Sequence, residues 1–111
     1  MKSDREASAG GSLVLLLVSP SRREDFFHVT RLKVVAARLE EGVVAFELFQ
    51  HKTRRGRYLL REVYKSPKDV ELHKATDHYA RWCSAMDDLL TEPRRRIEPG
   101  DLDWHEWRRV I

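Results

Sequence analysis

Residues 57–93 are the part of the sequence that indicates the fold most clearly. Residues 57–82 of this stretch read RYLLREVYKSPKDVELHKATDHYARW. Residues 57–65 alternate between two faces, as the side chains of a strand do. One face carries Tyr58, Leu60, Glu62 and Tyr64, and the other carries Leu59, Arg61 and Val63. The pattern predicts a strand with one largely apolar face on which a single carboxylate stands.

Two helix starts follow this strand. Ser66 precedes Pro67 and Asp69, a combination typical of a helix with a hydroxyl cap and proline at its first position. Thr76 then caps a second helix over residues 77–91, which ends before Pro93. Its apolar residues recur at helical spacing: Tyr79, Trp82, Cys83, Met86, Leu89 and Leu90.

The remaining elements are read in the same way. Residues 13–18, 43–50 and 95–98 are expected to be strands, and residues 52–56 a hairpin turn. A helix is expected over residues 22–41, with a capping box at Ser21 and Glu24 and a left-handed stop at Gly42. Its expected buried stripe is Phe26, Val29, Leu32, Val35, Ala36 and Leu39.

The order strand, helix, strand, strand, helix pair, strand is that of a ferredoxin-like α+β sandwich with a split βαβ pattern. We expect residues 1–12 to be a disordered leader, residues 13–98 the domain, and residues 99–111 a tail. Four apolar residues should pack the tail on its own domain or on a partner: Leu102, Trp104, Trp107 and Val110. Because the strand at 13–18 is apolar on both faces, a second subunit is a plausible cover for one of them.

Composition excludes several classes of function. The chain has 111 residues, 21 basic against 18 acidic, so its net charge of +3 gives little attraction for nucleic acid. Cys83 is the single cysteine and cannot form an internal disulfide, which fits a reducing compartment. The longest apolar run is far too short to span a membrane. We therefore expect a cytoplasmic protein with no nucleic-acid or membrane partner.

The sequence predicts that Glu62 and His73 lie close together, if the helix that carries His73 folds back over the strand that carries Glu62. Each lies about 10 Å from the chain reversal near Ser66, one along a strand and the other along a helix. A carboxylate on an apolar face needs a partner, and His73 is the nearest candidate. The pair could position an imidazole for proton transfer, or it could simply fasten a helix to the sheet.

Other residues could line a pocket beside this pair. Tyr64 could position a substrate oxygen, and the further candidates are Phe46, Tyr58, Leu60, His78, Tyr79 and Trp82. All of these could equally be core residues. His73 and His78 are five residues apart and separated by a cap, and the chain lacks both a cysteine pair and a glycine-rich phosphate loop. We therefore expect no metal site.

Three motifs together resemble the antibiotic-biosynthesis-monooxygenase family: Glu40-Glu41-Gly42, residues 62–67 (EVYKSP) and residues 73–79 (HKATDHY). The resemblance covers residues 13–98, and residues 62–96 are similar to the branch with the autoinducer-2-degrading isomerase. It implies a dimeric α/β barrel with a pocket between helices and sheet. It also implies a cofactor-independent monooxygenase that oxidises a small phenol or quinol with O₂. His73 would be the base, Glu62 would orient it, and Tyr64 would position the substrate.

Two alternatives stand beside the monooxygenase. One is an isomerase or tautomerase of a small phosphorylated or hydroxylated ketone, in which Lys33 and arginines bind an anion. The other is a homodimer that binds a small molecule without turnover. No haem is expected, because Cys83 stands where haem-degrading relatives carry an axial histidine. We expect no other cofactor.

Overall fold

The computed structural model describes residues 11–111, and the rest of the expected leader lies outside the described residues. Its strands are β1 (Gly11–Leu17), β2 (Val43–His51), β3 (Arg57–Tyr64), β4 (Arg95–Ile97) and β5 (Trp107–Arg109). Its helices are α2 (Arg23–Arg38), α3 (Pro67–Lys74) and α4 (Asp77–Leu89), with 3-10 turns η1 (Pro20–Arg22), η2 (Pro99–Asp101) and η3 (Trp104–Glu106). Gly11 and Ser12, which we had expected in the leader, belong to β1.

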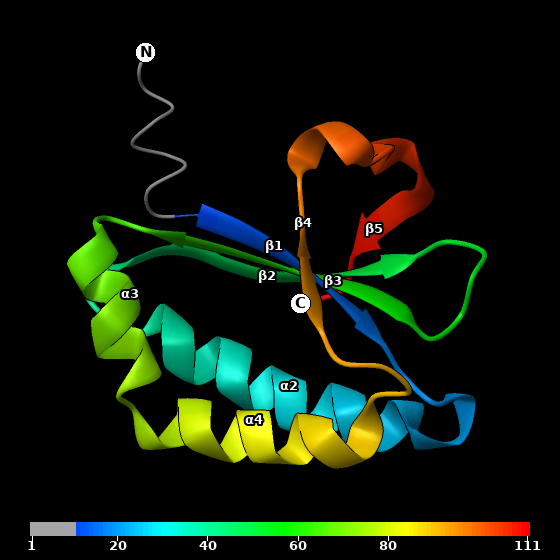
Figure 1. The fold of residues 1–111 in the computed structure, drawn as a ribbon, viewed down its shortest axis with the longest axis horizontal. Coiled ribbons are helices and arrows are strands. Elements are labelled where there is room, and N and C mark those ends of the chain that lie inside the picture. The colour runs from blue at the N-terminus through cyan, green and yellow to red at the C-terminus, as the bar shows by residue number, and fades with distance from the viewer. Residues whose placement is uncertain (1–10) are drawn as a thin grey trace.

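The strands form one antiparallel sheet in the order β4-β1-β3-β2-β5. The three helices lie on one face of this sheet, with α2 and α4 side by side and α3 across its end (Figure 1). This arrangement confirms the predicted ferredoxin-like α+β fold. No helix in residues 11–111 is long and apolar enough to cross a membrane.

Helices and sheet enclose one main core on the inner face of the sheet. The strand residues in it alternate as predicted, so Tyr58, Leu60 and Tyr64 of β3 all point inward. Helices α2 and α4 supply the opposite wall, mainly through Phe26, Val34, Ala37, Trp82, Met86 and Leu89. One pair of polar atoms lies inside this core, where the indole Nε1 of Trp82 donates to Thr30 Oγ1 at 3.1 Å.

The buried side of α2 differs from the prediction. Leu32, Val35 and Leu39 are exposed by 60%, 49% and 83%, whereas Thr30 and Lys33 are buried. The physical reason is that the helix presents polar groups with specific internal partners: Thr30 meets Trp82, and the ammonium of Lys33 meets a histidine described below. The three leucine and valine side chains therefore form a stripe on the surface.

The ends of α2 also differ from the prediction. No side-chain cap bond is found at its start, because the 3-10 turn η1 leads directly into the helix. Gly42 is not left-handed; among the described residues only Gly56, in the β2–β3 hairpin, has a positive φ, of 88°. A side chain at Gly42 would instead collide with Asp69 of α3, so glycine here allows the two elements to approach closely.

The two predicted helix caps after β3 are confirmed. Ser66 Oγ accepts from the backbone N–H of Asp69, and Thr76 Oγ1 accepts from that of Tyr79 at 3.2 Å. These caps fix the directions of α3 and α4, and hence the positions of His73 and Tyr79 relative to the sheet.

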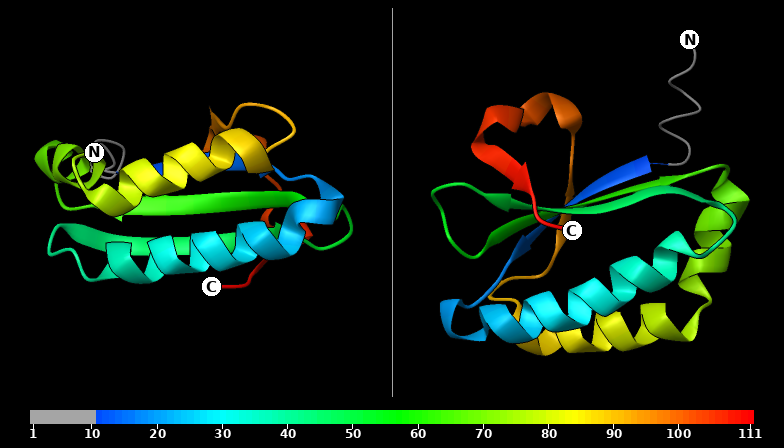
Figure 2. Two further views of the ribbon diagram at one scale, coloured as in Figure 1. Left: turned by 90° about the horizontal axis from the view of Figure 1, so that it is seen from below. Right: turned by 180° about the vertical axis from the view of Figure 1, so that it is seen from behind.

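Residues 98–106 lie over the outer face of the sheet, and β5 then joins its edge beside β2 (Figure 2). The prediction lacked β5, which pairs with the end of β2 through Phe49, Gln50 and His51. Trp107 is buried there with Leu15 and Leu59 in a small second cluster. In a single chain, the tail thus packs on its own domain.

Candidate functional site

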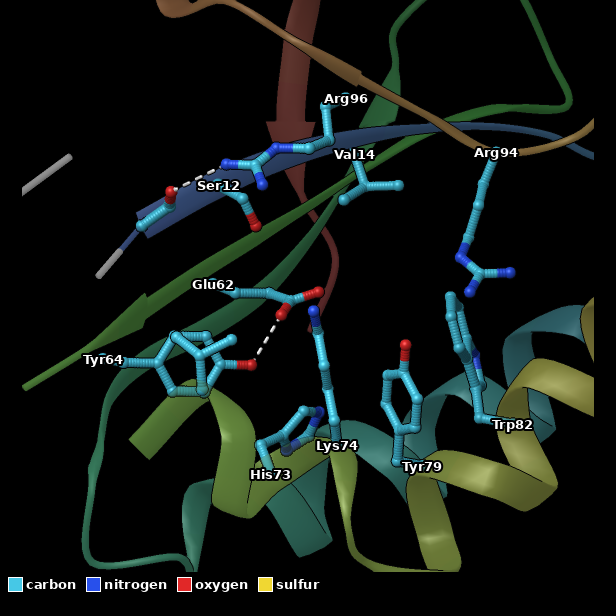
Figure 3. Close-up of a pocket in the computed structure, with 12 residues that line it drawn as sticks. Ser12, Val14, Glu62, Tyr64, His73, Lys74, Tyr79, Trp82, Arg94 and Arg96 are labelled. Carbon is cyan, nitrogen blue, oxygen red and sulfur yellow. Dashed lines mark hydrogen bonds between the residues drawn. The ribbon is translucent and has the colours of Figure 1, made fainter. Parts of the chain in front are cut away.

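A pocket of about 330 Å³ opens between the sheet and the helices α3 and α4. In Figure 3, side chains from β3 point into it from the sheet, side chains from α3 and α4 rise from the opposite side, and two arginines stand near β4. It is lined by Gly11, Ser12, Val14, Glu62, Tyr64, Val70, His73, Lys74, Tyr79, Trp82, Arg94 and Arg96.

Glu62 and Tyr64 form the sheet side of the pocket. The hydroxyl of Tyr64 donates to Glu62 Oε1 at 2.6 Å (Figure 3). Burial, followed by the nearby Glu62 carboxylate, raises the pKa of the Tyr64 phenol far above its ordinary value, so this phenol keeps its proton. The other carboxylate oxygen of Glu62 accepts no hydrogen bond from residues 11–111, which leaves it available to a ligand.

His73 lies opposite, on α3, and is 1% exposed. Its Nδ1 lies 2.9 Å from Glu40 Oε2, and its Nε2 lies 3.0 Å from Lys33 Nζ. The predicted bond between Glu62 and His73 is therefore wrong: both side chains line the pocket, but the carboxylate that holds His73 is Glu40. Glu62 has Tyr64 as its partner instead.

Lys33 is a buried cation, 3% exposed, beneath the pocket. Its Nζ lies 4.7 Å from the ring centre of Trp82, 4.9 Å from that of Tyr79 and 5.2 Å from that of Phe46. Aromatic faces attract a cation and compensate part of its lost hydration. Burial nevertheless lowers the pKa of Lys33 to about 8, against the attraction of Glu62.

The hydrogen bonds define the protonation state of His73. An ammonium can only donate, so Lys33 donates to Nε2, and Nδ1–H then donates to Glu40. Burial, together with the Lys33 charge, lowers the pKa of His73. The imidazole is therefore neutral and lies between a positive and a negative group.

Glu40 and His78 complete this network. His78 Nε2 lies 2.8 Å from the same Glu40 Oε2 that His73 contacts. Reasoning from the sequence missed Glu40, which entered only as part of a family motif, because it lies 33 residues from His73. One feature of the sequence could have indicated Glu40: it lies two residues before Gly42, where the chain passes close to α3.

Glu40, His73 and His78 are residue types that could together hold a metal ion, and their ligand atoms lie within 4.8 Å of one another. Two features argue otherwise. The nitrogen–oxygen distances of 2.8 and 2.9 Å are those of hydrogen bonds, whereas ligand atoms around tetrahedral zinc lie about 3.3 Å apart. The outer nitrogen of a metal-bound histidine normally donates to an acceptor, but here it faces an ammonium. The cluster fits a hydrogen-bonded network and does not fit a metal centre.

The pocket has a basic rim formed by Lys74, Arg94 and Arg96. The guanidinium of Arg94 lies 5.6 Å from the ring centre of Trp82, and an Nη of Arg96 donates to the Gly11 carbonyl at 3.5 Å. Three cations around one carboxylate make the pocket suitable for an anionic ligand.

The other predicted site residues divide into two groups. Tyr79 and Trp82 line the pocket, as does Tyr64. Phe46, Tyr58 and Leu60 belong to the inner core and do not line it, although the ring of Phe46 lies 5.4 Å from that of His73. His78 lies behind His73, with the ring centres 5.3 Å apart, and reaches the pocket only through the network.

Comparisons with known proteins agree with this architecture. An isomerase of Klebsiella pneumoniae, named for (4S)-4-hydroxy-5-phosphonooxypentane-2,3-dione, is 28% identical over 85 residues, which are 77% of this chain and 87% of the relative. The isomerase of the same name from Escherichia coli K12 is 29% identical over 77% of this chain and 88% of its own.

A solved structure from Nitrosomonas europaea, provisionally described as an antibiotic biosynthesis monooxygenase, superposes with a TM-score of 0.75 at 31% identity. The match covers 78% of this chain and 92% of that one. The family model described as antibiotic biosynthesis monooxygenase matches residues 13–85. By its sequence and by its fold, this chain belongs to the antibiotic biosynthesis monooxygenase family.

Proposed function

We propose that this protein is an isomerase that moves a proton along a small, anionic hydroxyketone. The observation that carries the proposal is the pocket itself, which Glu62 and His73 both line and whose rim carries three cations. Glu62 is bonded to Tyr64 through one oxygen, and His73 contacts the buried Lys33. The two curated relatives support it, because their name specifies a substrate with ketone, hydroxyl and phosphate groups.

The reaction needs a base and a counter-charge. Glu62 would take a proton from the carbon that bears the hydroxyl, next to the carbonyl, and so form an enediolate and a carboxylic acid. The hydroxyl proton would then pass to the former carbonyl oxygen, and Glu62 would return its own proton to the neighbouring carbon, so that hydroxyl and carbonyl exchange places. Charge on the enediolate would be balanced by Lys74 and by Lys33 acting through His73.

This proposal changes the role of His73. Both of its ring nitrogens already have partners, so it is not free to act as the first base. Glu62 is the better candidate because one of its oxygens faces the pocket without a partner among residues 11–111. Tyr64 holds the other oxygen and thereby orients the base.

The substrate would be held by its anionic end at the rim. Arg94 is supported by Trp82, and Arg96 comes from the same β4 side of the pocket with its guanidinium directed to Gly11. Hydrogen bonds from guanidinium groups to phosphate oxygens are strong and directional. The phosphate would therefore anchor there, and the reacting carbons would lie near Glu62.

The test is to incubate the purified protein with the phosphorylated hydroxydione without O₂ and to follow the substrate by NMR. We expect conversion to an isomer, and a loss of roughly 10²- to 10⁴-fold in Glu62→Gln. Glu71→Gln, which changes an exposed carboxylate of α3, is the matched control and should retain its activity. Absence of conversion combined with O₂ uptake on a panel of quinols would favour the cofactor-independent monooxygenase, and absence of both would favour a binding protein.

We also propose that two copies pair through the outer face of the sheet. On that face Leu17, Phe49, Ile97 and Leu102 are only partly buried, and Trp104 is 41% exposed. Sedimentation should therefore show a dimer that Trp104→Asp weakens. Leu32→Asp tests the rival surface on α2, since Leu32 is 60% exposed. A dimer disrupted by Leu32→Asp and unaffected by Trp104→Asp would contradict the outer-face proposal.

A further inference from the structure

A continuous chain of hydrogen bonds runs from the floor of the pocket toward the surface. It begins at Lys33, which is 3% exposed, and passes through His73 to Glu40, whose side chain is 21% exposed. The two steps measure 3.0 and 2.9 Å. The proposed reaction uses the charge of Lys33 but assigns no task to Glu40.

The middle member of this chain is an imidazole with one nitrogen facing each neighbour. A neutral imidazole accepts a proton at one nitrogen and releases another from the second, which makes it suitable as a shuttle. We propose that Lys33, His73 and Glu40 form a proton relay that connects the floor of the pocket with solvent. Lys33 would be recharged through it whenever it loses a proton to the pocket.

The proposed proton transfer along the relay conserves both atoms and charge. In the outward direction the Nζ–H bond of Lys33 breaks and an Nε2–H bond forms on His73, while the Nδ1–H bond breaks and an Oε2–H bond forms on Glu40. Lys33 becomes a neutral amine, Glu40 a carboxylic acid, and His73 stays neutral with its proton moved to the other nitrogen. The net charge of the three groups is unchanged, so the step creates no unbalanced buried charge.

The inner end of the relay, Lys33, lies directly behind residues that a ligand in the pocket would contact. The ammonium of Lys33 lies against His73, Tyr79 and Trp82, all of which line the pocket. Glu62 on β3, with Cys83 and Arg94 on the other side, supplies the remaining charged or titratable groups that act on Lys33. A proton that leaves Lys33 is thus close to the proposed reacting atoms.

His78 is a positioning residue in this arrangement. Its Nε2 lies 2.8 Å from Glu40 Oε2 and so fixes the oxygen that faces His73. Its Nδ1 is buried and has no hydrogen-bond partner among residues 11–111. Leaving a buried polar atom without a partner is unfavourable. That cost is consistent with a side chain retained for the geometry it gives Glu40.

The relay can be tested without any substrate. The exchange of the His73 ring N–H with solvent is measured by ¹⁵N NMR in the wild-type chain and in Glu40→Gln. Glutamine can still accept the hydrogen bond but cannot take up the proton, so we expect at least tenfold slower exchange. If the His73–Glu40 contact were only structural, the weaker hydrogen bond to glutamine would expose the ring, and the ring N–H would exchange faster.

Two controls complete this measurement. Glu71→Gln changes an exposed carboxylate on the same helix as His73 and should leave the exchange rate unchanged. Backbone amide spectra and melting temperatures show whether Glu40→Gln keeps the fold; His78→Gln, which moves Glu40 without removing it, serves as a second variant. Unchanged or faster exchange in folded Glu40→Gln and His78→Gln would overturn the relay.

A second readout rests on the proposed isomerase. With the phosphorylated hydroxydione in D₂O, the wild-type enzyme should place deuterium on the carbon that receives the proton, and Glu40→Gln should place several-fold less there, at early times and after subtraction of the isolated product's own exchange. Failure of the wild type to convert this compound overturns the proposed function but not the relay, because the NMR exchange result stands alone. Conversion with equal deuterium content in both proteins overturns the relay and leaves the isomerase intact.

Discussion

The two faces of the sheet are built in different ways. The inner face is enclosed by α2, α3 and α4 and contains buried ionisable groups, Lys33 and His73, within an apolar core. The outer face has a cluster of only three buried residues, Leu15, Leu59 and Trp107, beneath the C-terminal tail. Its charges, such as the pair Arg61 and Glu47, remain partly exposed.

This difference indicates which face of so small a domain can hold ionisable groups with altered pKa values. Burial changes the pKa values of Lys33, His73 and Tyr64 because water is excluded and specific partners take its place. On the outer face water screens the ion pairs. The proposed isomerase would therefore use the inner face, and the proposed dimer would form through the outer face.

The strongest test of this comparison is the loss of one large side chain from each face. Phe26 is fully buried against Tyr58, with ring centres 4.6 Å apart, so Phe26→Ala should cost about 3–5 kcal/mol of unfolding free energy. Trp107→Ala should cost less, because the tail can close part of the cavity. Urea unfolding of both variants measures the difference.

If Phe26→Ala does not fold, Phe26→Leu provides the same comparison at smaller cost. Equal losses for the inner and outer substitutions would show that the tail is as integral to the core as the helices. In that case the outer face could not be regarded as a separate surface.

A second test uses the buried charge on the inner face. The pKa of Lys33 is about 8 in the folded chain and ordinarily 10.5. Between these values the unfolded chain holds a proton that the folded chain has lost, so stability should rise with pH, by about 1.4 kcal/mol per pH unit for this one group. Below pH 8 both states hold the proton and this contribution is constant.

Urea unfolding at pH 8, 9 and 10 measures this increase, and Lys33→Met should lack it. Lys74→Met, which changes an exposed lysine, is the matched control and should behave like the wild type. The same pH slope in Lys33→Met and in the wild type would mean that the ammonium is stabilised as well inside as in water.

Local sequence signals predicted the elements around the site. Ser66 and Thr76 cap α3 and α4 as expected, because each cap depends on residues three positions apart. The alternation along β3 correctly placed Glu62 and Tyr64 on one face. These features depend on the backbone period and need no knowledge of tertiary contacts.

The features that depend on tertiary contacts could not be predicted in this way. Counting apolar residues placed Leu32 on the buried side of α2, whereas Leu32 is exposed and its neighbour Lys33 is buried. Lys33 is buried because His73 and three aromatic rings surround it, and these come from other elements. For the same reason His73 was paired with Glu62, when the carboxylate that reaches it is Glu40.

A third test concerns the rim, which connects the inner face with solvent. Arg94→Gln should raise KM for the phosphorylated substrate about tenfold, the equivalent of one charge-assisted hydrogen bond of about 1.4 kcal/mol. The value of kcat should change less, because the proposed binding mode places Arg94 at the phosphate and away from the reacting carbons. Steady-state kinetics with Arg81→Gln, an exposed arginine of α4, as the control would separate this effect from a general loss of positive charge.

The last test addresses the outer face directly, with an effect that is the smallest of all in a single chain. In a single chain Arg61 donates to Glu47 at 2.8 Å, and Arg109 reaches the other oxygen of Glu47 at 3.1 Å. The arginine side chains are 40% and 53% exposed, so Arg61→Ala should cost less than about 1 kcal/mol in the monomer. If two sheets pair through this face, the same charges become buried, and breaking the pair should cost several kcal/mol. Urea unfolding of Arg61→Ala at low and high protein concentration therefore distinguishes the two states: a loss that stays below 1 kcal/mol at both would mean that a second copy does not cover the outer face.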